Sequence, residues 1–189
     1  LGTDESVTSS ATAAVANVND APVLAISGTA TEDQTLTTVV NDEDGLGTIS
    51  YQWKRAGATI SGATANSYTL TQADVGSAIT VTVSYTDALG TAESVISSAT
   101  AAVANVNDTP SGTVTISGTA AEDQVLTAGN DLADADGLGS FSYQWKRAGA
   151  AISGATSTSY TLIQADVGKA ITVTARYTDA LGTGERVSS

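Results

Sequence analysis

A unit of about ninety residues occurs twice in this 189-residue chain, and this repeat constrains the fold more than any other feature. "YQWKRAGATISGAT" at 51–64 returns as "YQWKRAGAAISGAT" at 143–156, and "TQADVG" at 71–76 returns as "IQADVG" at 163–168. A partial third copy opens the chain, because 1–20 match 89–108 almost residue for residue. Units of this length are typical of complete domains in tandem. We expect the final strand and linker of a preceding repeat at 1–20, one domain at 21–108, and a second at 109–189 with a shortened final strand.

Apolar residues alternate with polar ones along most of each unit, which indicates half-buried strands. The clearest case is "AITVTVSYTD", where one face carries Ile79, Val81, Val83 and Tyr85. Shorter alternating runs are separated by clusters of Gly, Asn, Asp and Ser, as in a β-sandwich. About seven strands per unit are predicted, so the fold class is all-β. Trp53 and Trp145 share a face with other apolar residues, and we expect them in the core rather than on a sugar-binding surface.

Composition excludes several classes of function. The chain has no cysteine and no histidine, which removes disulfides, thiolate nucleophiles and imidazole acid–base chemistry. Its formal charge of −13 opposes binding to nucleic acid or to an anionic membrane surface. The sequence contains no run of eighteen apolar residues, so no membrane-spanning helix is predicted. We expect a protein that is not an enzyme, binds no nucleic acid and inserts into no membrane.

Several motifs carry a family resemblance. A tryptophan in the third predicted strand ("YQWKRAG"), followed by "SYTL", "TQADVG" and an alternating strand, resembles strands C, E and F of an immunoglobulin-type domain. Val81 lies near the place of the second core cysteine, and Ile79 replaces the corner tyrosine. The resemblance implies tandem immunoglobulin-like sandwiches without a disulfide. With its "NDAP" linker and its "YTDALG" turn, the chain is similar to immunoglobulin-like and cadherin-like repeats of giant secreted bacterial surface proteins, such as the stalks of RTX-type adhesins. This likeness implies an extracellular or cell-surface location.

Acidic residues gather in the loops of each unit, where converging oxygens are what calcium requires. Immunoglobulin connectivity places the incoming linker, the B–C loop and the F–G loop at one pole of a domain. The cadherin-like linker then implies a calcium site there, with Glu32 and Asp33 arriving from the preceding unit. The candidate ligands are Asn19, Asp20, Asp42, Asp44, Asp87, Glu32, Asp33, Asn107, Asp108, Asp134, Asp136 and Asp179. The alternative is that these acids only form turns and keep the chain soluble.

Two further polar features favour structural roles. Asp74 and Asp166 in "QADVG" are expected to cap a turn by accepting backbone hydrogen bonds. The basic pairs Lys54–Arg55 and Lys146–Arg147 are expected at solvated strand ends, the alternative being pairs with acids of a neighbouring unit.

The repeats favour a structural module that extends a bacterial adhesin or extracellular filament and is stiffened by calcium. Near-identical copies suit a spacer better than a receptor-binding head. The alternatives are a carbohydrate- or protein-binding module and an accessory domain of a secreted polysaccharide hydrolase. The expected partners are neighbouring repeats of the same chain. Residues 1–20 also carry a strand with no preceding domain, so strand addition between copies competes with an arbitrary cut through a longer chain.

Overall fold

The computed structural model describes residues 2–189 and divides them into two units. Unit 1 comprises Leu1–Leu70 and Gly76–Val103, of which Leu1 is not described, and unit 2 comprises Thr71–Val75 and Ala104–Ser189. Strands form every regular element except two short 3-10 helices. The all-β prediction is therefore confirmed.

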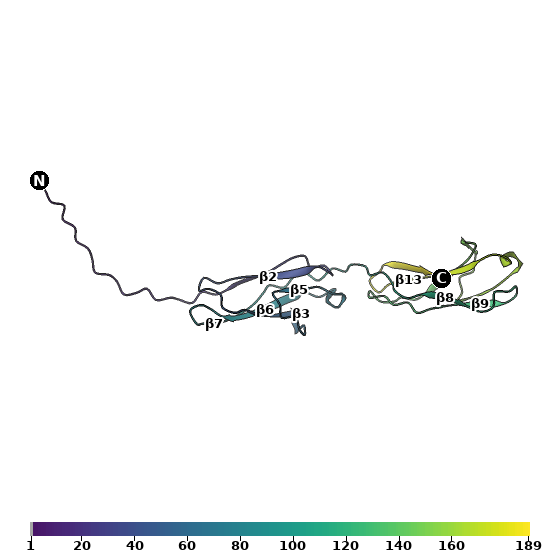
Figure 1. The fold of residues 1–189 in the computed structure, drawn as a ribbon, viewed down its shortest axis with the longest axis horizontal. Coiled ribbons are helices and arrows are strands. Elements are labelled where there is room, and N and C mark those ends of the chain that lie inside the picture. Colours follow the sequence, from purple (N-terminus) through teal and green to yellow (C-terminus); the bar gives the residue numbers. More distant parts are fainter. Residues whose placement is uncertain (1) are drawn as a thin grey trace. The chain divides into compact units, whose positions relative to one another are not determined.

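Unit 1 is a sandwich of two antiparallel sheets (Figure 1). One sheet has the order β1-β2-β5 and the other the order β4-β3-β6-β7. Its strands are β1 (Val23–Ser27), β2 (Thr35–Asn41), β3 (Ser50–Arg55), β4 (Ala58–Thr59), β5 (Ser67–Thr69), β6 (Ile79–Thr86) and β7 (Ala92–Ile96). The 3-10 helix η1 (Gln72–Asp74) lies between β5 and β6 in the sequence and belongs to the Thr71–Val75 segment of unit 2. Three strands facing four in this order are the A-B-E and C-F-G arrangement of an immunoglobulin-type sandwich, with β4 as an extra edge strand.

Unit 2 repeats this topology with the orders β12-β9-β8 and β11-β10-β13-β14. Its strands are β8 (Val114–Ser117), β9 (Val125–Asn130), β10 (Ser142–Arg147), β11 (Ala150–Ala151), β12 (Ser159–Thr161), β13 (Ile171–Thr178) and β14 (Gly184–Ser188), with η2 (Gln164–Asp166) between β12 and β13. Even the register is kept, since Trp53 lies opposite Val81 and Trp145 opposite Val173.

A fully buried tryptophan lies at the centre of each unit. Trp53 and Trp145 are both 0% exposed, and their indole N–H groups donate to the carbonyls of Ala65 and Ser157 at 2.9 Å. Trp145 also packs against Tyr160, with ring centroids 5.8 Å apart. The prediction that the tryptophans belong to the core is confirmed.

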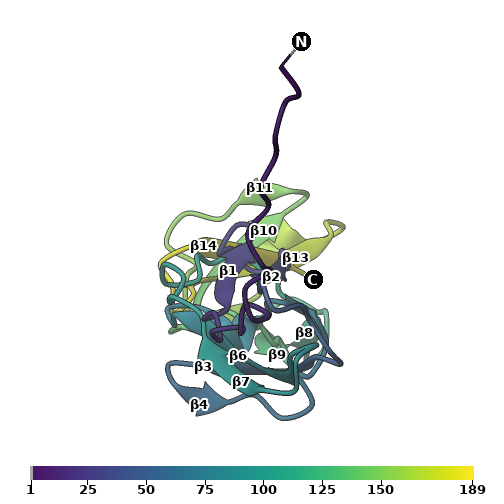
Figure 2. The same cartoon turned by 90° about the vertical axis from the view of Figure 1, so that its left-hand side faces the viewer.

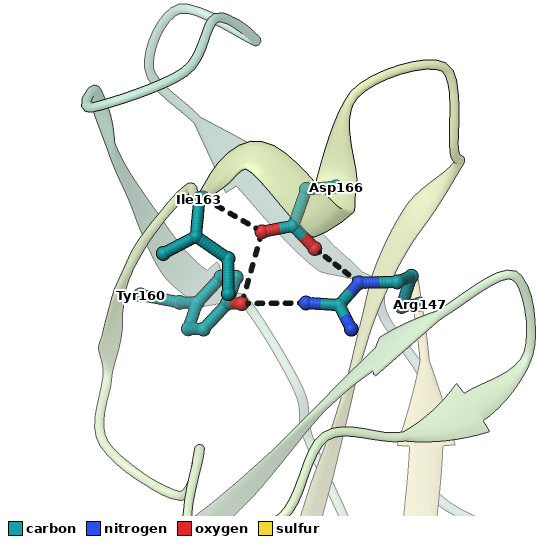
Figure 3. A network of polar contacts seen from close by, with 4 residues as sticks. All are labelled: Arg147, Tyr160, Ile163 and Asp166. Atoms are coloured by element: carbon teal, nitrogen blue, oxygen red, sulfur yellow. Dashed lines mark hydrogen bonds and ion pairs between the residues drawn. The ribbon is translucent and has the colours of Figure 1, made fainter.

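The turn before β13 is held by a buried carboxylate (Figure 3). Asp166 accepts hydrogen bonds from the Ile163 amide at 2.8 Å and the Tyr160 hydroxyl at 3.0 Å, which confirms the predicted cap. Arg147 donates to the other oxygen of Asp166 at 2.6 Å. The prediction of a solvated strand end is therefore wrong for Arg147, because the strand brings its guanidinium beside a buried acid of its own unit.

Residues 2–18 contain no strand and run away from the unit 1 sandwich as an extended segment (Figure 2). Val7 and Val15 in this segment are 98% and 95% exposed. No helix within residues 2–189 is both long and apolar enough to cross a bilayer.

Candidate metal-binding site

The linker that enters each unit forms hydrogen bonds with the same two acids of that unit, an aspartate in the B–C loop and a glutamate in the last strand. In unit 2 the Asp108 amide donates to Asp136 Oδ2 at 2.8 Å, and the Asn107 side chain donates to Glu185 Oε1 at 2.9 Å. In unit 1 the Asp20 amide donates to Asp44 Oδ2 at 2.8 Å, and the Asn19 side chain donates to Glu93 Oε1 at 2.8 Å. The Asn-x-Asn-Asp linker therefore recurs because its amides bind the pole of the sandwich it enters.

The B–C loop presents its acids through a fixed turn. In unit 2 the Asp136 amide donates to Asp134 Oδ1 at 3.0 Å, and the Tyr177 hydroxyl donates to Asp134 Oδ2. Burial and this hydrogen bond raise the pKa of Tyr177 well above its ordinary range. The Asp42, Asp44 and Tyr85 side chains repeat the arrangement in unit 1. Asp42 and Asp134 thus each use both oxygens to shape the loop, which leaves Asp44 and Asp136 as the better ligands.

Two glycines allow the B–C loop to lie against the F–G turn. Gly137 has φ +90°, a left-handed conformation that favours glycine. A Cβ on Gly139 would lie 1.9 Å from the Thr178 carbonyl oxygen, so only glycine fits this approach to β13. The Ala180 amide then donates to the Asp136 carbonyl at 3.2 Å. The "DGLG" motif therefore brings Asp136 beside the loop that contains Asp179.

The F–G aspartate in each unit is buried and only half satisfied. Asp179 Oδ1 accepts the amides of Leu181 and Thr183 at 2.8 Å, whereas its Oδ2 is buried and has no hydrogen-bond partner among the described residues. Asp87 has the same pair of amides and the same unpartnered Oδ2. Backbone hydrogen bonds, led by that of Thr91, hold the pKa of Asp87 below its ordinary value. Both groups are therefore carboxylates at neutral pH.

Asp136 contributes a second buried oxygen without a partner. It is 3% exposed, and its Oδ1 has no hydrogen bond within residues 2–189. Carboxylate oxygens of Asp108 and Asp136 lie within 4.8 Å of each other. Buried carboxylate oxygens left without donors are costly. The carboxylates of Asp108 and Asp136 can therefore contribute oxygen ligands to a metal site.

Hydrogen bonds join the linker to the B–C loop in each unit, from Asp108 to Asp136 in unit 2 and from Asp20 to Asp44 in unit 1. Asp134 and Asp42 shape those loops, and the F–G turns that contain Asp179 and Asp87 bond to the same loops through the amides of Ala180 and Ala88. The set of ligands remains a prediction. Glu32 and Asp33 follow β1, in the turn before β2. Glu32 is 4% exposed, and Asp33 is exposed with φ +62°.

Sequence reasoning missed Glu93 and Glu185, which orient the linker asparagines. Both are at the start of the last strand, where "ESV" and "ERV" place an acid on the same face as a half-buried valine. An acid at the same position in both copies was the available signal.

No family model matches the chain, and no curated protein matches it. A solved structure of three N-terminal domains of the bacteriophage RB49 Highly Immunogenic Outer Capsid protein (Hoc) is similar to it, with 18% identity and a TM-score of 0.37. The match covers 89% of this chain, which spans 58% of that structure's length. The immunoglobulin-type description of the units rests on their strand order.

Proposed function

We propose that the chain is a non-enzymatic structural segment of a bacterial cell-surface adhesin or extracellular filament. Its immunoglobulin-like units act as spacers in tandem, and calcium bound at the linker pole of each unit stiffens the array. The resemblance to repeats of RTX-type adhesin stalks supports this class of protein. An extracellular location fits the chemistry, because modules of this kind bind calcium at about 10⁻⁴–10⁻³ M.

One observation carries the proposal: buried carboxylate oxygens without hydrogen-bond donors lie in the loops that meet the linker. Asp136 Oδ1 and Asp179 Oδ2 are such oxygens in unit 2, and Asp87 Oδ2 is its counterpart in unit 1. Several negative groups in one place repel each other unless a cation neutralises them. Turn formation alone explains Asp131, which is exposed and accepts a hydrogen bond from the Thr113 amide. It does not explain buried carboxylate oxygens that accept no hydrogen bond from any of residues 2–189.

Glu32 and Asp33 have a distinct place in this proposal. They are the ligands that the preceding unit would add to the site made by Asp108 and Asp136. Calcium would then connect two units and limit bending at the linker. The Glu32→Gln substitution tests this step separately, since it should weaken calcium binding at unit 2 while it leaves the site at unit 1 unchanged.

Calcium dependence of thermal unfolding tests the site. A ligand that binds only the folded state raises the melting temperature, so millimolar calcium should stabilise the chain and a chelator should reverse the effect. Asp179→Asn should reduce the calcium-dependent rise for unit 2, because it removes the charge of a half-satisfied ligand. Asp131→Asn is the matched control: it removes the same charge from an exposed residue and should preserve the rise. Equal responses of the two variants, or no rise in the unsubstituted chain, would contradict the proposal.

A further inference from the structure

Two arginines on neighbouring strands of unit 2 face each other on the outer surface of its four-stranded sheet. Arg176 of β13 lies opposite Arg186 of β14 in the antiparallel register, and both are exposed. Ala175 and Tyr177 on either side of Arg176 are buried, so the arginines lie on the face away from the core. Like charges directly opposite each other destabilise an antiparallel pair. Within residues 2–189 neither guanidinium has a hydrogen-bond or ion-pair partner to offset this repulsion.

The arginines border a hollow on this face whose other side chains are small and polar. Ser142 of β10 lies opposite Arg176, so Ser142, Arg176 and Arg186 form one row across three strands. Thr178 and Gly184 form the next row. These five residues border a hollow of about 490 Å³. The surface therefore offers two guanidiniums and two hydroxyl groups around a space that a small polar group can enter.

Glu185 also borders the hollow, but its carboxylate is engaged elsewhere. It alternates with Arg186 along β14 and lies opposite the buried Tyr177, so its side chain belongs to the other face of the sheet. There it accepts the hydrogen bond from the Asn107 side chain at 2.9 Å. The positive charge of the arginines is therefore not neutralised by this acid of their own strand.

Unit 1 has the same hollow without the charges. It measures about 420 Å³ and lies over the corresponding parts of β3, β6 and β7. Ser84 and Ser94 take the places of Arg176 and Arg186, and their hydroxyls form a hydrogen bond at 3.2 Å. Neutral side chains therefore satisfy this position of the fold. The arginines of unit 2 are better explained by an anionic ligand than by the needs of the sandwich.

We propose that this hollow of unit 2 binds an acidic polysaccharide, whose carboxylate groups pair with Arg176 and Arg186. A guanidinium can donate two parallel hydrogen bonds to one carboxylate, and the hydroxyls of Ser142 and Thr178 can bond to sugar hydroxyls. A protein partner fits less well, because protein interfaces have an apolar centre and this lining has no exposed apolar side chain. A single-stranded nucleic acid would need aromatic side chains for base stacking, and the lining has none that is exposed.

The acidic charge of the whole chain does not prevent this contact. At physiological salt, exposed charges more than about 8 Å apart are largely screened from each other, so the nearest charges decide the binding of a short ligand. On this surface the nearest charges are the two arginines. The site adds a ligand to the proposed spacer role and does not depend on calcium.

An NMR titration of the full chain with a short oligomer of galacturonic acid, in chelator, tests the site. Amide resonances of β10, β13 and β14 should shift, and those of β3, β6 and β7 should not. Arg176→Ser should weaken binding by about tenfold, because it removes a charge-assisted contact. Lys169→Ser is the matched control: it also removes one exposed positive charge and also introduces the serine of unit 1, but it should change the affinity by less than about twofold. No binding of the oligomer, or equal weakening by the two substitutions, would overturn the proposal.

Transfer of the arginine pair to unit 1 tests whether the pair is sufficient. Ser84→Arg combined with Ser94→Arg should create a second site, so that resonances of β6 and β7 also shift and the number of oligomers bound per chain doubles. An uncharged oligomer of galactose should shift neither unit. A transferred pair that binds nothing would contradict the role of the arginines. Equal affinity for a glutamate peptide of the same charge would contradict a polysaccharide as the ligand.

Discussion

Units 1 and 2 share one topology but differ at the end where the last strand finishes. Ile79 is fully buried in unit 1, whereas its counterpart Ile171 is only partly buried in unit 2. Ser97 is buried, but Ser189 is exposed. The adjacent strands are nearly identical in sequence, so the difference follows from residues 98–103, which cover this end of unit 1. Residues 98–103 therefore supply the cover that keeps Ile79 buried in unit 1.

The cores differ in a second way that leaves the fold unchanged. Val83 in unit 1 is replaced by Ala175 in unit 2, while Ile49 is replaced by Phe141. Phe141 packs edge-on against Tyr177, with ring centroids 5.2 Å apart. Volume lost at one core position is accompanied by volume gained at another, an exchange that cores tolerate well. The two units should therefore have similar stabilising interactions around their tryptophans.

Removing the core tryptophans should have the largest effect, and it tests whether the two units are stabilised to a similar degree. Trp53→Ala and Trp145→Ala should each destabilise their own unit by about 3–5 kcal/mol, as large-to-small core substitutions do. Each unit contains one tryptophan, so in either variant the remaining tryptophan fluorescence follows urea unfolding of the unsubstituted unit. Circular dichroism follows the unfolding of both units. A cost below about 1 kcal/mol in either unit would contradict the core assignment.

Breaking the Arg147–Asp166 pair should have the next largest effect. Arg147→Met leaves a buried carboxylate without its cation, which should destabilise unit 2 at neutral pH. Burial raises the pKa of Asp166, but hydrogen bonds from Arg147, the Ile163 amide and Tyr160 outweigh burial and hold the pKa below its ordinary value. The folded state thus binds this proton less readily than the unfolded state does.

The lowered pKa of Asp166 in the folded state determines how the stability of unit 2 depends on pH. The contribution of Asp166 to stability is present above the unfolded carboxyl pKa of about 3.9 and is lost as pH falls through the lower folded pKa. Urea midpoints between neutral and acid pH should decline less steeply in Arg147→Met than in the unsubstituted chain. Parallel pH profiles would show that the ion pair does not lower this pKa.

The smallest effect compares the two copies of one segment. Val103→Ala removes a buried side chain and should cost unit 1 about 2 kcal/mol. Val15→Ala, at the same place in the repeat, should change the stability of the monomer by less than about 0.5 kcal/mol, because Val15 is exposed. Urea unfolding at low concentration measures both. Similar costs for the two variants would mean that residues 9–16 are packed in the monomer.

The sequence predicted the fold well because its signals are local and occur twice. Alternation in Ile79–Tyr85 and the repeated tryptophan motif identified strands and core. Connectivity then grouped the linker with Asp136 and Asp179. The sequence did not reveal that the Tyr177 hydroxyl donates a hydrogen bond to Asp134 or that Arg147 forms an ion pair with Asp166. Both contacts depend on the directions of side chains from segments that are far apart in the sequence. Which carboxylate oxygens are left free to bind a metal is therefore decided by the hydrogen bonds of the folded loops.

Small-angle scattering of the chain in chelator and in millimolar calcium tests the central claim most directly. Calcium at the linker pole should neutralise Asp108, Asp136 and Asp179 and restrict bending between units. The radius of gyration should rise on calcium addition, reach a plateau in the millimolar range and return in chelator, while Asp136→Ala should reduce the change. A radius of gyration that is the same with and without millimolar calcium would contradict the account, and the linker would then be a polar connection without a metal.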